Sequence, residues 1–217
     1  IRSVASGFQS IKSGDTKIVI AGGQESMSLA PHSVHLRDGQ KLGDTELTDT
    51  MIKDGLWDAF HGYHMGITAE NVAEKFQVTR EEQDKFALKS QEKAIKAQKE
   101  NKFKNEIINF KIKSRKAEID FIKDEHPREG INLEALKRLK PVFKKDGTVT
   151  AGNASGINDG AAAVTLMSDS EAEKRGLQKL VSIKSWASCG VEPSLMGTGP
   201  IPSSKKALDL AGWSVKD

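Results

Sequence analysis

The stretch KIVIAGG at residues 17–23 decides the fold class, since an apolar run leads directly into two glycines. Short apolar runs that end in glycine are typical of a buried strand followed by a turn. Upstream, Val4, Phe8 and Ile11 recur at helical spacing, and Gly14 is expected to end that helix. A helix, a short turn and an apolar strand in this order predict an α/β protein whose sheet is covered on both faces.

Further elements are predicted downstream of this strand. Thr79 with Glu82 three positions later is a capping box, and it predicts the start of a long, mostly exposed helix. Apolar and polar residues alternate over residues 108–112, which predicts a half-buried strand. Apolar runs at residues 161–167 and 180–186 predict two more strands.

Composition indicates a globular protein. Of the 217 residues, 37% are hydrophobic and 29% are charged. No apolar run approaches the roughly 18 residues that a membrane-spanning helix needs. The single cysteine, Cys189, cannot form an internal disulfide, which favours a reducing compartment over secretion. The chain begins with Ile1 and shows no secretory leader, so we expect the natural N-terminus to lie upstream.

Positive charge is concentrated in the middle of the chain. The net charge of +3 is too small to indicate nucleic-acid binding, but residues 79–150 contain 19 Lys or Arg against 13 Asp or Glu. Such a basic stretch suits a small polyanion such as a nucleotide phosphate. The alternative is a solvated, lysine-rich helical surface.

A loop of small residues is the strongest local signal for a ligand site. Residues 150–160 read TAGNASGINDG, and small residues this dense predict a close approach of the backbone to a ligand or to another segment. If they lie at a helix start, their successive free amides can hold an anion or a carbonyl oxygen. The loop matches neither the P-loop nor the dinucleotide fingerprint. Structural packing is the alternative role.

Other candidate residues have weaker patterns. His61 and His64 have a spacing that can bind a metal, but no third ligand is evident, whereas His64 lies between apolar neighbours and can line a substrate pocket. Cys189 can be a nucleophile or a buried, inert thiol. Ser155 lacks the surrounding glycine pattern of a nucleophile elbow, and Arg128 lies in a charged, solvated loop.

Four stretches together resemble the thiolase family in their order and spacing. The segment HMGITAEN at residues 64–71 looks most like the biosynthetic acetyl-CoA acetyltransferases, and especially like their cytosolic form. The four stretches are residues 19–28, 62–71, 148–162 and 196–200.

The resemblance implies a partial thiolase fold of the α/β class. Residues 1–28 and 148–175 are expected to form part of the N-terminal mixed-sheet half. Residues 29–147 are expected to form the loop domain that binds CoA, and residues 176–217 the start of the C-terminal half.

The resemblance also implies an activity. Thiolases condense two acetyl-CoA into acetoacetyl-CoA and run the reverse thiolysis, with CoA thioesters as substrates, no separate cofactor and no metal. A cytoplasmic homotetramer in lipid metabolism, in the mevalonate pathway, is expected, with the mitochondrion as the other compartment. Neither nucleic acid nor a membrane is an expected partner.

The family's catalytic segments lie outside these residues. Its nucleophilic Cys-x-Ser-Gly precedes Ile1, and its Asn-Glu-Ala-Phe, Gly-His-Pro and Cys-x-Gly-Gly segments follow Asp217. Cys189 matches none of them, so we assign no catalytic residue. We expect this stretch to be an internal piece of a thiolase and inactive by itself.

Several CoA-binding positions of the family match residues of this sequence. Among them, Ser155 is expected to form a hydrogen bond with the pantetheine arm of CoA. Arg128 matches a basic residue at the nucleotide end of CoA, whereas Ala135 stands where some relatives have a serine. The full set is Leu56, His64, Met65, Arg128, Phe143, Ala151, Ser155, Ile157 and Met196.

Three alternatives stay open at this point. The chain can be a truncated, non-catalytic paralogue that binds CoA or joins thiolase oligomers. It can be an interaction protein that uses only the basic helical region. It can also come from a longer-chain degradative thiolase.

Overall fold

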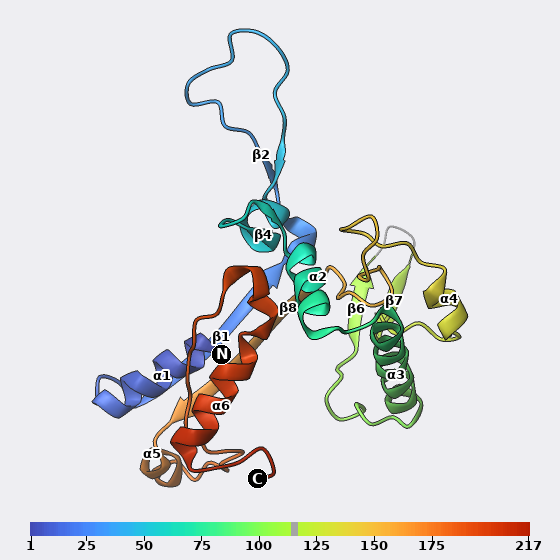
Figure 1. Cartoon of the computed structure of the whole chain (residues 1–217). Coiled ribbons are helices and arrows are strands. Elements are labelled where there is room, and N and C mark those ends of the chain that lie inside the picture. The colour runs from blue at the N-terminus through green and yellow to red at the C-terminus, as the bar shows by residue number, and fades with distance from the viewer. Residues whose placement is uncertain (114–116) are drawn as a thin grey trace. The chain divides into compact units, whose positions relative to one another are not determined.

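The computed structural model describes residues 1–113 and 117–217 (Figure 1). The chain divides into two compact units, of which the first comprises Ile1–Thr68 with Gly156–Asp217 and the second comprises Ala69–Ser155. Helices and strands are both present, which confirms the predicted α/β class. None of the helices in the described residues combines the length and apolar character needed to cross a bilayer.

The first unit is built on an antiparallel ribbon of two strands, β1 (Ile18–Ser26) and β8 (Asp159–Met167). They pair over their full lengths, from Ile18 opposite Met167 to Ser26 opposite Asp159. The other elements of this unit are α1 (Arg2–Ser13), η1 (Met27–Leu29), β2 (His32–Ser33), β3 (Thr48–Asp49), η2 (Met51–Leu56), β4 (Trp57–Asp58), β5 (Tyr63–His64), the start of α2 (Met65–Phe76), α5 (Asp169–Lys174), η3 (Pro193–Thr198) and α6 (Pro200–Ala211).

Helix α1 packs closely on one face of the ribbon. A Cβ at Gly7 would lie 2.9 Å from Val19 Cγ1 and 3.0 Å from Leu166 Cδ1, so only glycine allows this approach. On the other face, Ile20 is 76% exposed and Ile18 is 36% exposed. The prediction that the sheet is covered on both faces is therefore wrong for the described residues, because α1 covers a single face.

The second unit is organised around the long helix α3 (Arg80–Lys99). The remaining elements are most of α2, β6 (Phe110–Lys113), β7 (Glu118–Phe121) and α4 (Leu133–Lys137). The predicted capping box is confirmed, since the Glu82 amide donates to Thr79 Oγ1 at 3.2 Å and the Thr79 amide donates to Glu82 Oε2 at 2.8 Å.

Three of the predicted strands differ from the structure. The turn expected at Gly22 and Gly23 is wrong, because β1 continues through both glycines and pairs with β8 as far as Ser26. The strand near residues 108–112 exists as β6, but all four of its residues are exposed rather than half-buried, because its hairpin with β7 forms a separate two-stranded sheet. Residues 180–186 form no strand, since among the described residues no neighbour pairs with them. Side chains hold this segment instead, with Ser185 Oγ donating to the Ala207 carbonyl at 2.6 Å and the Arg2 guanidinium lying 5.1 Å from the Trp186 ring.

The capping box gives a test of the fold. We expect Thr79→Ala to lower the free energy of unfolding by about 1 kcal/mol, because the Glu82 amide loses its acceptor at the start of α3. Urea denaturation followed by circular dichroism measures this difference. Ser90→Ala, at an exposed position within the same helix, is the matched control. Equal destabilisation by both substitutions would show that the cap contributes nothing.

Candidate functional site

A buried carboxylate joins two of the sequence motifs inside the second unit. Glu70 on α2 is 4% exposed, and its oxygens accept hydrogen bonds from the backbone amides of Thr148 and Val149, each at 2.8 Å. The Thr148 hydroxyl donates to Glu70 Oε2 at 2.8 Å and accepts from Gln83 Nε2 of α3, also at 2.8 Å. The segment that enters the small-residue loop is thus fixed to both helices.

These contacts determine the protonation of Glu70. Burial raises the pKa of its carboxyl, but the hydrogen bonds from Val149 and Thr148 and the positive charge of Lys144 outweigh burial and hold the pKa below its ordinary value of 4.5. The carboxylate is therefore charged at neutral pH, and it acts as a structural acceptor whose oxygens are already engaged.

Asn153 fixes the small-residue loop itself. Its Nδ2 donates to Asp84 Oδ1 and to the Thr148 carbonyl, each at 3.0 Å, and its Oδ1 accepts from the Thr150 amide at 2.8 Å. Asp84 is 1% exposed and also accepts from Arg80 Nε at 2.8 Å. The loop is therefore tied to α3 through the buried Asp84, which pairs with the partly exposed Arg80.

The same loop packs against α4 through its backbone. A Cβ at Gly152 would lie 2.5 Å from Leu136 Cδ2 and 2.6 Å from Leu139 Cδ1, so a larger residue has no room there. Arg80 donates to the carbonyl oxygens of Leu136 at 2.7 Å and of Leu139 at 3.0 Å, which holds this wall in place. The density of small residues thus has a packing cause at Gly152.

The expectation of successive free amides in the loop is wrong for its first half. The amide of Thr150 donates to Asn153 Oδ1, and that of Gly152 donates to Thr150 Oγ1 at 3.2 Å. The amides of Asn153 and Ala154 donate to the Thr150 carbonyl. No helix starts at residues 150–160, and the first half of the loop directs these amides to its own side chains and carbonyl groups rather than to an anion.

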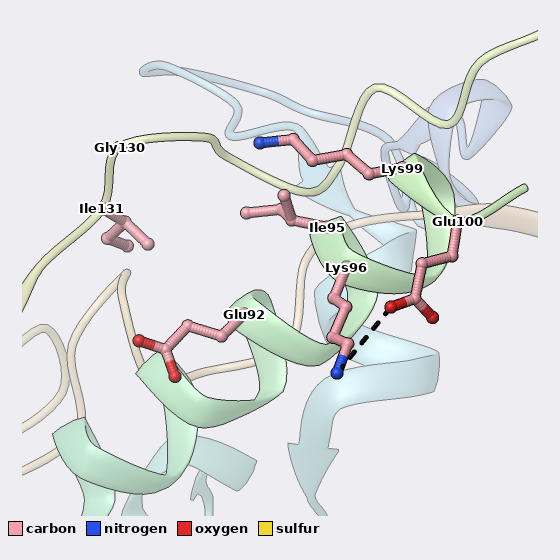
Figure 2. A pocket seen from close by; sticks show the side chains of 7 residues that line it. All are labelled: Glu92, Ile95, Lys96, Lys99, Glu100, Gly130 and Ile131. Atoms are coloured by element: carbon pink, nitrogen blue, oxygen red, sulfur yellow. Dashed lines mark ion pairs between the residues drawn. The ribbon is translucent and has the colours of Figure 1, made fainter.

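Arg128 lies on a segment that runs beside α3. Its backbone amide donates to Gln91 Oε1 of that helix at 2.9 Å, and its own side chain is exposed. Just beyond, residues 130–131 and the last turns of α3 enclose a hollow of ≈ 350 Å³ (Figure 2). Ile95 and Ile131 form its apolar lining. The other residues that line it are Glu92, Lys96, Lys99, Glu100 and Gly130.

In the first unit, His64 lies at the end of the hairpin formed by β4 and β5. Its Nδ1 accepts a hydrogen bond from the Gly66 amide at 2.9 Å, where α2 begins. In the neutral ring the proton is therefore on Nε2, the nitrogen that can donate to a carbonyl oxygen. His64 and Met65 are both half-buried.

The turn of this hairpin is held by Asp58, which is 8% exposed. His61 Nδ1 lies 2.8 Å from Asp58 Oδ2, and the His61 ring stacks on Tyr63 with a centroid separation of 5.4 Å. Burial raises the pKa of Asp58, but the hydrogen bonds from His61 and Phe60 outweigh burial, so the pKa lies below its usual range. Among the described residues no group of three or more His, Cys, Asp or Glu is placed to hold a metal.

In the first unit, another carboxylate joins the stretch at residues 19–28 to the end of the stretch at residues 148–162. Asp159 at the start of β8 accepts hydrogen bonds from the amide of Ser28, at 3.0 Å, and from its hydroxyl. The Ser28 hydroxyl and amide hold the pKa of Asp159 below its usual range. Residues 19–28 and 148–162 are thus connected at the end of the ribbon.

The structure distributes the predicted CoA-binding residues between the two units. Ala151 and Ser155 are exposed on the small-residue loop, and Phe143 lies next to Val142, whose amide pairs with the Val149 carbonyl. The second unit contains Arg128, Phe143, Ala151 and Ser155, and the first contains Leu56, His64, Met65, Ile157 and Met196. Cys189, which received no role, is half-buried.

Sequence reasoning missed the residues that hold the loop. Glu70 lies in the stretch at residues 62–71 and Asn153 in the loop of small residues, but the sequence around neither residue indicates its partner. A signal was available for Asp84, because Arg80 lies four positions earlier on a predicted helix. No local pattern shows that Asp84 contacts a residue 69 positions away in the sequence.

Comparisons with known proteins decide the family. The model of the thiolase N-terminal domain matches residues 1–170. The chain belongs to the thiolase family. It is 60% identical to an acetyl-CoA acetyltransferase of Rhizobium meliloti over 217 residues, which are 100% of this chain and 55% of that relative. It is 55% identical to the cytosolic acetyl-CoA acetyltransferase of Rattus norvegicus over 219 positions, again 100% of this chain and 55% of the relative.

A solved thiolase has the same fold. The human mitochondrial 3-ketoacyl-CoA thiolase in complex with CoA superposes with a TM-score of 0.91 at 42% identity, over 99% of this chain and 54% of the human chain. The predicted partial thiolase fold is confirmed. This thiolase chain spans about 55% of the length of the relatives that it matches.

The buried position of Glu70 predicts a pH-dependent stability. Because its pKa is lower in the folded protein, its stabilising effect is complete above the unfolded value of 4.5 and is lost as pH falls below it. At neutral pH we expect Glu70→Gln to cost about 2 kcal/mol, since an amide group would face the donors of residues 148–149. The acid-induced loss of stability should be smaller in this variant.

Urea denaturation of the wild type and the variant at neutral pH and below the ordinary carboxyl pKa measures both effects. Glu74→Gln, one turn further along α2, is the control, because Glu74 is exposed and makes only a 3.4 Å ion pair with Lys144. A variant at Glu70 with wild-type stability would contradict the role of the buried carboxylate.

Proposed function

We propose that the protein containing this chain is an acetyl-CoA C-acetyltransferase, which condenses two acetyl-CoA molecules into acetoacetyl-CoA and catalyses the reverse thiolysis. The observation that carries this proposal is the 60% identity to a bacterial acetyl-CoA acetyltransferase along the whole chain. The matched region is the whole chain and therefore includes the segments that Glu70 joins.

The proposed role of this chain is to bind CoA thioesters rather than to supply the nucleophile. The four predicted residues of the second unit lie on segments fixed to α3 or to each other, and a rigid scaffold of this kind suits ligand binding. In the first unit, His64 has the tautomer that donates through Nε2, which suits a thioester or ketone carbonyl.

The proposed catalytic cysteines and activating histidine belong to segments other than these 217 residues. Accordingly, we propose that this stretch has no thiolase turnover by itself. A cytoplasmic location is supported by the cytosolic name of the rat relative, and a homotetramer remains a proposal from the family resemblance.

The decisive experiment is to sequence the transcript through both ends and to assay the encoded protein. We expect Cys-x-Ser-Gly upstream, Asn-Glu-Ala-Phe and Cys-x-Gly-Gly downstream, and CoA-dependent cleavage of acetoacetyl-CoA by the full-length protein. Start and stop codons that bracket about these residues would contradict the activity and favour a CoA-binding or oligomer-joining module. Faster turnover of long than of short 3-ketoacyl-CoAs would favour a degradative thiolase.

Ser155 gives a residue-level test in the full-length enzyme. We expect Ser155→Ala to raise the KM for CoA about five- to tenfold with little change in kcat, because one hydrogen bond to the pantetheine arm is lost. Steady-state thiolysis kinetics measure both constants. Ser188→Ala, at an exposed position in the first unit, is the control. An unchanged KM would remove Ser155 from the proposed site.

A further inference from the structure

The side chain of Asn153 uses all of its hydrogen-bonding groups except one acceptor position. Both Nδ2 protons are donated, one to buried Asp84 and one to the Thr148 carbonyl, while Oδ1 receives the Thr150 amide. Its neighbours in the loop, Ala151 and Ser155, are exposed. The side-chain amide of Asn153 thus fixes the backbone between the exposed residues Ala151 and Ser155.

Asp84 requires a hydrogen-bond donor at position 153. Its Oδ2 is taken by Arg80 Nε at 2.8 Å, and its Oδ1 by Asn153 Nδ2 at 3.0 Å. The Asp84 side chain is 2% exposed, so water cannot replace a missing partner. A carboxylate at position 153 would therefore place two negative charges about 3 Å apart in a buried site.

We propose that Asn153, held by Asp84, is a positioning residue that fixes residues 150–155 in the conformation that binds the pantetheine arm of CoA. This inference rests on the proposed function, since Ala151 and Ser155 are its proposed CoA contacts. Asn153 does not touch the reacting atoms. It acts through the loop, and Asp84 acts through Asn153.

The test substitutes Asn153→Asp in the full-length enzyme and follows thiolysis kinetics together with direct calorimetric titration of CoA. Above about pH 7 we expect the KM and the Kd for CoA to rise about tenfold or more, while kcat changes less than about threefold, because loop geometry and not chemistry is altered. Melting temperature is measured in parallel.

A pH profile separates positioning from simple loss of stability. Between about pH 7 and about pH 5 the ratio of variant to wild-type KM should fall, because the carboxyl pair at positions 153 and 84 then shares a proton and regains a donor. The charged groups that face this pair are Arg80, on α3 with Asp84, and Glu70 on α2, which reaches it through Thr148.

Asn109→Asp is the matched control, because Asn109 Nδ2 also donates to an aspartate, Asp120, at 2.9 Å, but on the exposed hairpin. We expect this variant to keep the wild-type KM at every pH. Should Asn153→Asp fail to fold, Asp84→Asn is the second variant. The amide oxygen of the new asparagine can still accept the hydrogen bond from Asn153, but its amide nitrogen is a donor that faces the donor of Arg80. We therefore expect a smaller rise in KM than for Asn153→Asp.

The outcomes are distinct. A folded Asn153→Asp protein with the wild-type KM and Kd for CoA overturns the inference and leaves the proposed function intact, as does an unchanged KM in Asp84→Asn. Equal effects of the substitutions at Asn153 and Asn109 also overturn it. A wild-type protein that neither binds CoA nor cleaves acetoacetyl-CoA overturns the proposed function, and the positioning role with it.

Discussion

The buried carboxylate of Glu70 is the constraint on which the second unit depends. A charged group that is 4% exposed is stable only when its oxygens are hydrogen-bonded, and here two backbone amides and one hydroxyl serve this purpose. The backbone of residues 148–149 must consequently stay next to α2. Gly147 follows from the same constraint, because a Cβ there would lie 2.4 Å from Glu70 Oε1.

The loop after this anchor is rigid for a related reason. Buried Thr150, which is 0% exposed, and Asn153 close the loop onto itself, and Asp84 with Arg80 ties it to α3 and to the carbonyl groups near α4. Polar networks of this kind specify a single geometry only when every member is satisfied. Among the described residues, no buried side-chain nitrogen or oxygen lacks a hydrogen-bond partner.

The first unit uses the same chemistry at the end of its ribbon. Asp159 accepts both hydrogen bonds that Ser28 offers, and Asp58 accepts from His61 and from the Phe60 amide in the hairpin next to His64. Carboxylates with depressed pKa values thus secure the connections in each unit. These carboxylates are structural, because their oxygens accept hydrogen bonds within the protein. The residues proposed to contact CoA are neutral or basic, which suits a substrate that carries phosphates and a thioester.

The sequence by itself determined the α/β class, the capping box at Thr79, the course of α1 and α3 and the presence of β1 and β8, because helical and strand periodicity and capping depend on residues close together in the chain. The thiolase family followed from the resemblance of four stretches. The end of β1 was not predicted, because its pairing with β8 carries it through Gly22 and Gly23. The sequence also pointed to the loop of small residues. Only the tertiary structure showed that amides in the first half of that loop are occupied and that Asn153 donates a hydrogen bond to Asp84. Within the part of the chain that the structure describes, residues 180–186 have no strand partner. Pairing and long-range hydrogen bonds depend on distant segments and leave no local pattern.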